Sequence, residues 1–385
     1  MRGRLAARGR PGTAAVRAYA PIAVTAVVLA LVPLRYEDSR TMMGVIITGA
    51  LFAAYAIGFN VIFGFTGQLF LCMGALAGLG GYASAILSDD SGIPLVPSMA
   101  LATLLSAAVG GLLSWVAVSR SLGVIFTGIV TLAFSLSFQN LLLGRRDLTG
   151  GETGLVVDAG SDTFLGERVQ PYYALLAVVV VYLVLVRMLQ RSHIGWAFRA
   201  LRDDEVAAEL AGVDVKRYRV LAGAVGAAMI GFAGAVYAHS EGFISPSTYD
   251  FGRVDVRVIV MLAFGGIGSL LGPVVGAAAF TIVDEWLVSA DEYRLVIYGA
   301  VILALFLFFP RGVVPTVGSL AQRLRRRVAA RRVPPGAVVQ AEGRASGAAA
   351  PAATPDVASV GASGAPGVPG APGDPTLADE GDDDR

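Results

Sequence analysis

The sequence predicts an all-α membrane protein, a polytopic helical bundle of about 8–10 spans with broken or re-entrant helices. The chain is 55% hydrophobic and only 15% charged, whereas soluble domains carry roughly 25% charged residues. Its mean hydropathy is +0.67. Uncharged runs long enough for a membrane span recur along the chain, and residues 41–88 contain no charge at all. Together these observations exclude a soluble globular fold.

The N-terminal half predicts five spans. Residues 18–34 follow an arginine-rich arm and lack a small-residue cleavage site, so they predict an uncleaved first span rather than a signal peptide. Residues 41–88 have room for two spans, with a break at Gly64–Gln68. Residues 92–119 and 121–144 predict one span each.

The C-terminal half is less regular. Residues 145–170 are polar and predict an external loop that includes 148–154. Further spans are predicted at 171–186, 220–238 and 295–309. Residues 258–283 are uncharged but are interrupted by glycines and Gly272-Pro273, which predicts a broken helix at membrane depth.

The distribution of arginine predicts the topology. The basic regions 1–17, 187–219 and 311–332 are expected on the cytoplasmic side. Both termini are then cytoplasmic, so the number of crossings is even: about ten if 258–283 is a broken pair, about eight if it is one re-entrant hairpin. We expect a cytoplasmic arm at 1–17, a membrane domain at 18–310, and a basic and then low-complexity disordered tail at 311–385.

The stretch 199–219 is the most charged interior segment. We expect Asp203 to be the N-cap of a short helix, with further acids near its N-terminus, where the helix dipole favours them. Val206, Leu210 and Val213 share one face, and the rest of the surface is small. Two interpretations stay open: a docking element for a cytoplasmic protein, or an ordinary interfacial helix.

Two uncharged stretches carry polar or flexible residues that suit a translocation path. Intramembrane amides and hydroxyls tend to face a cavity or the bundle interior, and irregular backbone is tolerated where it is covered or lines water. The alternative is interhelical hydrogen bonding with close glycine packing. The predicted path residues are Asn60, Thr66, Gly67, Gln68, Gly265, Gly266 and Gly268.

Other functions find little support in the residues. Cys72 is the only cysteine and there are two histidines, which argues against a disulfide or a metal site. No catalytic triad, paired intramembrane carboxylates or Walker sequence is visible, so no catalytic residues are expected and the chain is not predicted to be an enzyme. The net charge of +1 gives no field for nucleic acid. An ion-coupled secondary transporter would need ionisable groups at mid-membrane, and a channel would need pore-lining polar periodicity.

Several motifs resemble one family. The segment ALRDDEVAAELAGVDVKRYR, residues 200–219, resembles the coupling-loop motif of ABC importer membrane subunits, although Val206 separates Glu205 from the two alanines. NVIFGFTGQL, LTGGETG, GFISPSTYDF and FGGIGSLLGPVVGAA resemble permeases of branched-chain amino acid importers, in the expected order over about residues 50–310. After Gln68, Phe70-Leu71-Cys72-Met73 departs from the Ser-Leu-Gly-His often found there, which leaves the substrate open.

The resemblance implies a permease subunit in a bacterial inner membrane that forms the path for branched-chain or related amino acids. It implies four kinds of contact: two cytoplasmic ABC ATPases, a second homologous permease, an extracytoplasmic substrate-binding protein and the membrane. The chain itself would need no cofactor, because the ATPases bind ATP. A coupling loop at about 191–219 would receive them, through Arg202, Asp203, Asp204, Glu205, Ala208 and Gly212. Urea, short amides or sugars remain alternative substrates, and ion-coupled secondary transport an alternative mechanism.

Overall fold

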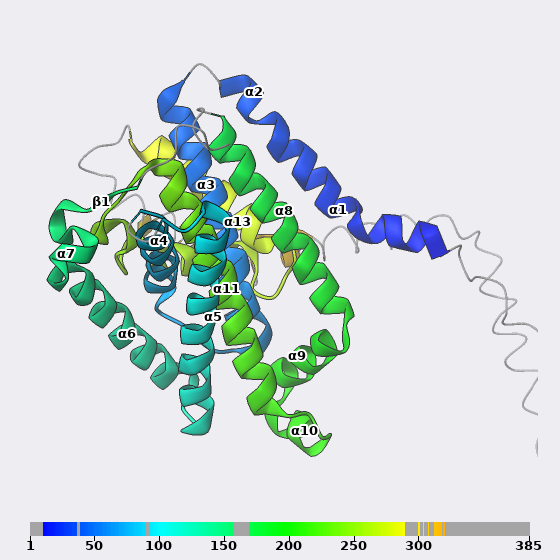
Figure 1. Ribbon diagram of the computed structural model, residues 1–385. Coiled ribbons are helices and arrows are strands. Elements are labelled where there is room, and N and C mark those ends of the chain that lie inside the picture. Colours follow the sequence, from blue (N-terminus) through cyan, green and yellow to red (C-terminus); the bar gives the residue numbers. More distant parts are fainter. Residues whose placement is uncertain are drawn as a thin grey trace, which may run out of the picture. The chain divides into compact units, whose positions relative to one another are not determined.

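The computed structural model describes residues 11–36, 39–89, 92–157, 169–288, 299–300, 303, 307, 312–317 and 319. The chain divides into two units, Met1–Leu324 and Arg325–Arg385, and every described residue lies in the first. These residues are almost entirely helical, which confirms the predicted all-α class (Figure 1). The expected tail at 311–385 lies outside the described residues except for 312–317 and 319.

The helices follow the predicted runs. In the first half they are α1 Pro11–Leu31, α2 Pro33–Tyr36, α3 Arg40–Phe59, the π-helical turn η1 Asn60–Gly64, α4 Met73–Asp89, α5 Leu95–Ser119, α6 Val124–Gly144, α7 Arg146–Thr149 and the 3₁₀ turn η2 Gly151–Thr153. In the second half they are α8 Gln170–Arg191, α9 His193–Asp203, α10 Glu205–Leu210, α11 Val215–Glu241, the 3₁₀ turn η3 Pro246–Tyr249, α12 Asp255–Gly265 and α13 Gly272–Val288.

Within the described part of the chain, five helices are long and apolar enough to cross a membrane: Thr41–Gly64, Leu95–Ser119, Val124–Gly144, Gln170–Arg191 and Val215–Glu241. A shorter apolar helix covers Tyr19–Leu31, where the first span is predicted. Both predicted interruptions are present, between η1 and α4 and between α12 and α13. The predicted last span, 295–309, lies outside the described residues except for 299–300, 303 and 307.

Helix α11 forms the centre of the bundle and packs against α5, α4 and α3. Small residues allow this close approach: a Cβ at Gly80 of α4 would collide with the backbone of Gly231 in α11. Such contacts are typical of membrane helices, where packing rather than hydrophobic exclusion drives association. Hydrogen bonds add to it, since the Tyr182 hydroxyl of α8 donates to the Met229 carbonyl oxygen at 2.6 Å.

Helices α5 and α6 carry the outward apolar surface. Large side chains along both are exposed, among them Leu104, Trp115, Ile125, Phe126 and Ile129. Most of their inward positions are small or hydroxylated, such as Ser106 and Gly110 in α5. This arrangement suits helices that contact lipid on one side and the bundle on the other.

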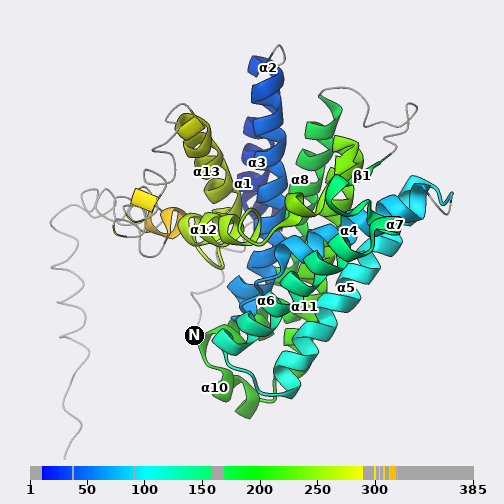
Figure 2. The same ribbon diagram turned by 90° about the vertical axis from the view of Figure 1, so that its left-hand side faces the viewer.

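The connections after α6 and after α11 meet in a small antiparallel sheet. Strand β1, Leu155–Val156, pairs with β2, Phe243–Ile244, with Leu155 opposite Ile244. The predicted loop 148–154 is thus joined to the loop 240–255. Figure 2 shows β1 and α7 well separated from α10, which lies at the other end of the bundle.

Candidate functional site

The two interruptions predicted as path segments meet at Asn60. The Asn60 side chain is 1% exposed. Its Oδ1 accepts a hydrogen bond from the Gly268 backbone N–H at 2.7 Å, and its Nδ2 donates to the Ser269 carbonyl oxygen at 3.0 Å. A single amide therefore holds the η1 turn against the α12–α13 connection, and two predicted path residues are in contact.

The backbone at both interruptions depends on glycine. Gly67, Gly266 and Gly268 have φ values of +71°, +115° and +75°, in the region that residues with a side chain rarely adopt. Gly268 also has no room for a side chain, because a Cβ there would collide with Nη1 of Arg202. Gly265 packs directly against the backbone of Gly272. These glycines shape the connections, and no described contact of theirs marks them as substrate ligands.

Gln68 is buried, and both the nitrogen and the oxygen of its side-chain amide are hydrogen-bonded. Its Nε2 lies 3.1 Å from the Thr66 hydroxyl and donates to the Arg219 carbonyl oxygen at 3.0 Å. The Ser114 hydroxyl of α5 lies 2.6 Å from Gln68 Oε1 and 2.9 Å from the same Arg219 oxygen. Thr66 donates to the Ile62 carbonyl oxygen of its own turn at 2.6 Å. Gln68 thus joins the non-helical segment to α5 and to the start of α11.

The charged segment is two helices rather than one. Helix α9 ends at Asp203, and the chain restarts in α10 at Glu205. The prediction that Asp203 is the N-cap is wrong: Asp204 has the extended backbone of a cap, and its Oδ1 accepts from the Ala207 N–H at 3.0 Å. With two aspartates in succession, the sequence alone could not choose between them.

Helix α10 ends in a tight glycine cap and exposes apolar side chains. Gly212 N–H donates to the Glu209 carbonyl oxygen, and Val213 N–H donates to that of Ala208, the pair of bonds that defines a Schellman motif. Ala208 is buried. Val206 and Leu210 are 67% and 85% exposed, so α10 presents an apolar edge to its surroundings.

Glu205 is paired within the chain. Its two carboxylate oxygens each lie 2.8 Å from a guanidinium nitrogen of Arg219, which lies near the start of α11. The Arg219 side chain is 18% exposed and that of Glu205 is 46% exposed. Because the Arg219 carbonyl oxygen binds Gln68, a continuous set of contacts runs from α10 to the interruption before α4.

A second contact reaches the other interruption. Arg202 of α9 lies against Gly268, and its Nη2 is 3.5 Å from the Ile267 carbonyl oxygen. Arg202 also lines a cavity of about 350 Å³ with Phe65, Arg187 and Arg199. The predicted coupling segment and the predicted path segments therefore form one connected site, centred on Asn60 and Gln68.

Sequence reasoning missed two members of this site, Arg219 and Ser114. Ser114 could have been found, because Ser106, Gly110 and Ser114 recur every four residues in an uncharged helix and so form a small, polar packing face. Arg219 gave no such signal, since its partner lies 14 residues earlier across a helix boundary. No group of three His, Cys, Asp or Glu that could hold a metal ion is present in the described part of the chain.

Comparison with known proteins identifies a family and relatives for this chain. The family model "Branched-chain amino acid transport system / permease component" matches residues 41–307. The permease protein LivM of the high-affinity branched-chain amino acid transport system of Salmonella typhimurium is 29% identical over 303 residues, 72% of this chain and 71% of LivM. LivH of the same system in Escherichia coli is 27% identical over 295 residues, 71% of this chain and 94% of LivH.

The name of another relative refers to a different transported molecule. It is the autoinducer 2 import system permease protein LsrC of Salmonella paratyphi B, which is 26% identical over 320 residues, covering 80% of this chain and 88% of LsrC. No solved structure matches the chain. The apolar helices and the match of the family model over most of the membrane domain agree in describing a multi-pass membrane protein that transports and is not an enzyme. The chain belongs to the family of permease components of branched-chain amino acid transport systems.

Proposed function

We propose that this chain contributes the membrane path for branched-chain amino acids in an ABC importer of the bacterial cytoplasmic membrane. The family match and the names of LivM and LivH favour this cargo over urea, short amides or sugars. A second, homologous permease would complete the path, and an extracytoplasmic binding protein would deliver the substrate. Both termini would be cytoplasmic, as the arginine-rich regions favour.

Two partner ATPases would bind and hydrolyse ATP on the cytoplasmic side, and α9 and α10 would receive them. The exposed Val206 and Leu210 side chains support this role, because an apolar edge on a charged cytoplasmic element is well suited to a protein partner. The caps at Asp204 and Gly212 hold α10 as a compact unit of six residues. Such a unit would move as a body when its partner moves.

The single observation that carries the mechanism is the set of contacts from Glu205 through Arg219 to Gln68. A displacement of α10 would pull on the Arg219 guanidinium through two charge-assisted hydrogen bonds, which are among the stronger polar contacts in proteins. Arg219 is continuous with α11, the central helix, and its carbonyl oxygen binds Gln68. Motion at the ATPase side would thus reach both the central helix and the non-helical segment that opens the path.

In this proposal the predicted path residues Thr66, Gly67, Gly265 and Gly266 have a conformational role. These residues would not bind the substrate strongly. They would allow the backbone near the Asn60 hydrogen bonds to rearrange as access alternates. Irregular backbone at membrane depth is tolerated where it lines a cavity or is covered by protein. Substrate capture is then left to the binding protein and to the outer end of the bundle.

The test is Glu205→Gln, which keeps the shape of the side chain and removes its charge. Loss of a partly exposed, bidentate pair costs about 1 kcal/mol, which corresponds to about a fivefold change. The importer, reconstituted in liposomes with its ATPases, second permease and binding protein, should take up about fivefold less leucine per ATP hydrolysed. Glu209→Gln is the matched control, because Glu209 lies on the same helix and is exposed. Equal uptake per ATP in the two variants would refute the coupling role of Glu205.

A further inference from the structure

Helices α8 and α9 line a cavity of about 350 Å³ together with one residue from each of the two interruptions. This volume lies within the roughly 300–1,000 Å³ typical of sites for small molecules. Three arginines, Arg187, Arg199 and Arg202, face this arginine cavity, and its described lining contains no aspartate or glutamate. A cleft lined by charges of one sign attracts ligands of the opposite sign, so the cavity favours an anion.

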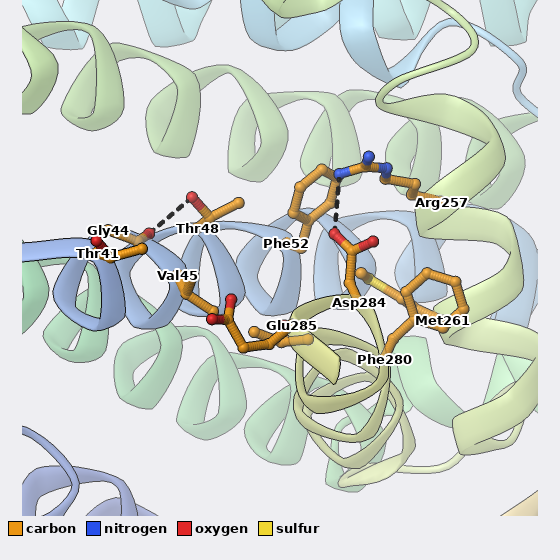
Figure 3. Close-up of a pocket in the computed structure, with 11 residues that line it drawn as sticks. Thr41, Gly44, Val45, Thr48, Phe52, Arg257, Met261, Phe280, Asp284 and Glu285 are labelled. Carbon is orange, nitrogen blue, oxygen red and sulfur yellow. Dashed lines mark hydrogen bonds and ion pairs between the residues drawn. The ribbon is translucent and has the colours of Figure 1, made fainter. Parts of the chain in front are cut away.

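A second cavity of similar size shows what a compensated arginine looks like. It lies between α3, α12 and α13, has a volume of about 310 Å³ and is lined by charges of both signs (Figure 3). There Arg257 Nη1 lies 3.8 Å from Asp284 Oδ2, and Glu285 lines the same cavity. Because the arginine cavity has no acid in its described lining, the charge that compensates it has to come from outside that lining.

Arg187 is the member of the arginine cavity whose donors are free. Its Nε is buried and has no hydrogen-bond partner. Among the described residues, the recorded ion pairs do not involve Arg187. An arginine always carries its charge and has five N–H donors, and buried polar groups nearly always have a partner. The unpaired Nε therefore marks a place where an acceptor from outside the chain would bind.

Arg199 and Arg202 are held in place by the chain. Arg199 Nη2 donates to the Gln190 carbonyl oxygen at the end of α8, and its Cζ lies 5.1 Å from the centroid of the Trp196 ring. Arg202 lies against Gly268. These contacts leave further N–H donors on both guanidinium groups. Two of the three cations are thus positioned before a ligand binds, which lowers the entropic cost of binding.

The side chains around the cavity are those of a membrane surface. Met188, next to Arg187 on the apolar helix α8, is 56% exposed, and Trp196 on α9 is 66% exposed. Exposed tryptophan is typical of the membrane–water interface, where lipid headgroups lie. Figure 1 shows α9 leaving the end of α8 at the same end of the bundle as α10. A ligand in the headgroup layer would therefore lie beside the arginines.

We propose that the arginine cavity binds the phosphodiester headgroup of an anionic phospholipid, with Arg187 as the principal contact and Arg199 and Arg202 beside it. A phosphate accepts parallel hydrogen bonds from the planar guanidinium group, which a lysine could not donate. Phosphatidylcholine also carries a phosphate, but its ammonium group would lie among three arginines without a carboxylate to pair with. The proposed topology places this site in the cytoplasmic leaflet, whose anionic lipids attract basic segments near the membrane.

The test is native mass spectrometry of the purified full-length permease in neutral detergent, titrated with phosphatidylglycerol or with phosphatidylcholine. The first phosphatidylglycerol should bind about tenfold more tightly than phosphatidylcholine, and Arg187→Gln should weaken its binding about tenfold, because a hydrogen bond to a charged group contributes about this factor. If Arg187→Gln is not monodisperse, Arg187→Lys replaces it: this variant keeps the charge, loses the planar fork and should still bind several-fold more weakly.

Arg191→Gln is the matched control. Arg191 lies on the same helix about one turn later and is exposed, and its Cζ lies 5.4 Å from the centroid of the Tyr19 ring. Binding of phosphatidylglycerol to this variant should stay within about twofold of that to the unmodified permease. Equal losses in Arg187→Gln and Arg191→Gln would indicate a diffuse effect of surface charge and would overturn the proposal, as would equal binding of the two lipids.

Inorganic phosphate distinguishes a lipid headgroup from a free anion. Equimolar inorganic phosphate should leave phosphatidylglycerol bound, because it lacks the acyl chains that hold the lipid along the exposed apolar face of α8. Displacement of the lipid under this condition would assign the cavity to free phosphate and overturn the lipid assignment. These measurements do not depend on what the permease transports, so their failure would leave the proposed function standing.

Discussion

Replacing Asn60 by leucine should loosen the joint between the two interruptions. Leucine has the same branched arrangement of side-chain heavy atoms as asparagine but no polar atoms, so the change removes both hydrogen bonds to the α12–α13 connection without opening a space. The Gly268 N–H and the Ser269 carbonyl oxygen then lose their partner in a site where Asn60 itself is 1% exposed. The η1 turn and the α12–α13 connection are then no longer held at a fixed distance by the Asn60 side chain.

The magnitude follows from the two lost bonds. Side-chain hydrogen bonds between membrane helices contribute about 0.6 kcal/mol on average and at most about 1.7 kcal/mol. Two such bonds give about 1–3 kcal/mol, and the unpaired Gly268 and Ser269 groups push the value toward the upper end. At about 2–4 °C per kcal/mol, the melting temperature should fall by about 2–12 °C.

The assay is thermal unfolding of the purified permease in detergent, followed by leucine uptake in liposomes. Asn140→Leu is the matched control. The Asn140 side chain is exposed, and among the described residues its hydrogen bond goes to the Leu136 carbonyl oxygen of its own helix, at 2.9 Å. We expect Asn60→Leu to melt lower and to transport less per ATP, and Asn140→Leu to resemble the unmodified protein. Equal melting temperatures and equal uptake for the two variants would refute the role of Asn60 in holding the two interruptions together.

Three further predictions concern backbone space and docking. Gly268→Ala should reduce uptake and lower the melting temperature by several degrees, because φ is +75° and the new Cβ meets Arg202. Gly144→Ala is its control: nothing lies within 4 Å of the new Cβ, so uptake should be unchanged and the melting temperature should not fall. Gly80→Val should abolish the folded permease in size-exclusion chromatography, since α4 and α11 touch there; a monodisperse variant would contradict this packing. Leu210→Asp should leave the melting temperature of the permease unchanged, because the side chain is 85% exposed, but should reduce co-purification of the ATPases; retention equal to that of the unmodified protein would argue against α10 as the docking element.

The sequence predicts the helical class and both interruptions because these depend on local composition. Uncharged runs of the length of a span, ended by arginines or glycines, leave few alternatives. The interruptions carry their own signal, since Gly67, Gly266 and Gly268 occupy backbone conformations that suit glycine. These features require no knowledge of which segments meet.

The roles of individual polar residues could not be predicted, because they depend on partners far away in the chain. Asn60 and Gln68 were expected to face a path, yet their amides are occupied by backbone groups 208 and 151 residues away. Periodicity identifies a polar side chain inside an apolar run but not the group that satisfies it. The contact between Arg257 and Asp284 could not be predicted for the same reason, because only the packing of α12 on α13 brings the two side chains within 3.8 Å.

The pairing of Glu205 with Arg219 changes what the charged segment can do. An acid engaged in two 2.8 Å bonds within the chain is not available as a primary contact for an ATPase. In the proposed mechanism, docking on α10 would depend on the exposed apolar edge, and Glu205 would transmit the displacement to the central helix. Because the two roles belong to different residues, a change of charge at Glu205 should reduce uptake per ATP more than it reduces assembly with the ATPases. A change at Leu210 should reduce assembly more than it reduces uptake per ATP. The two variants measured side by side therefore separate the contact that receives the motion from the contact that passes it on.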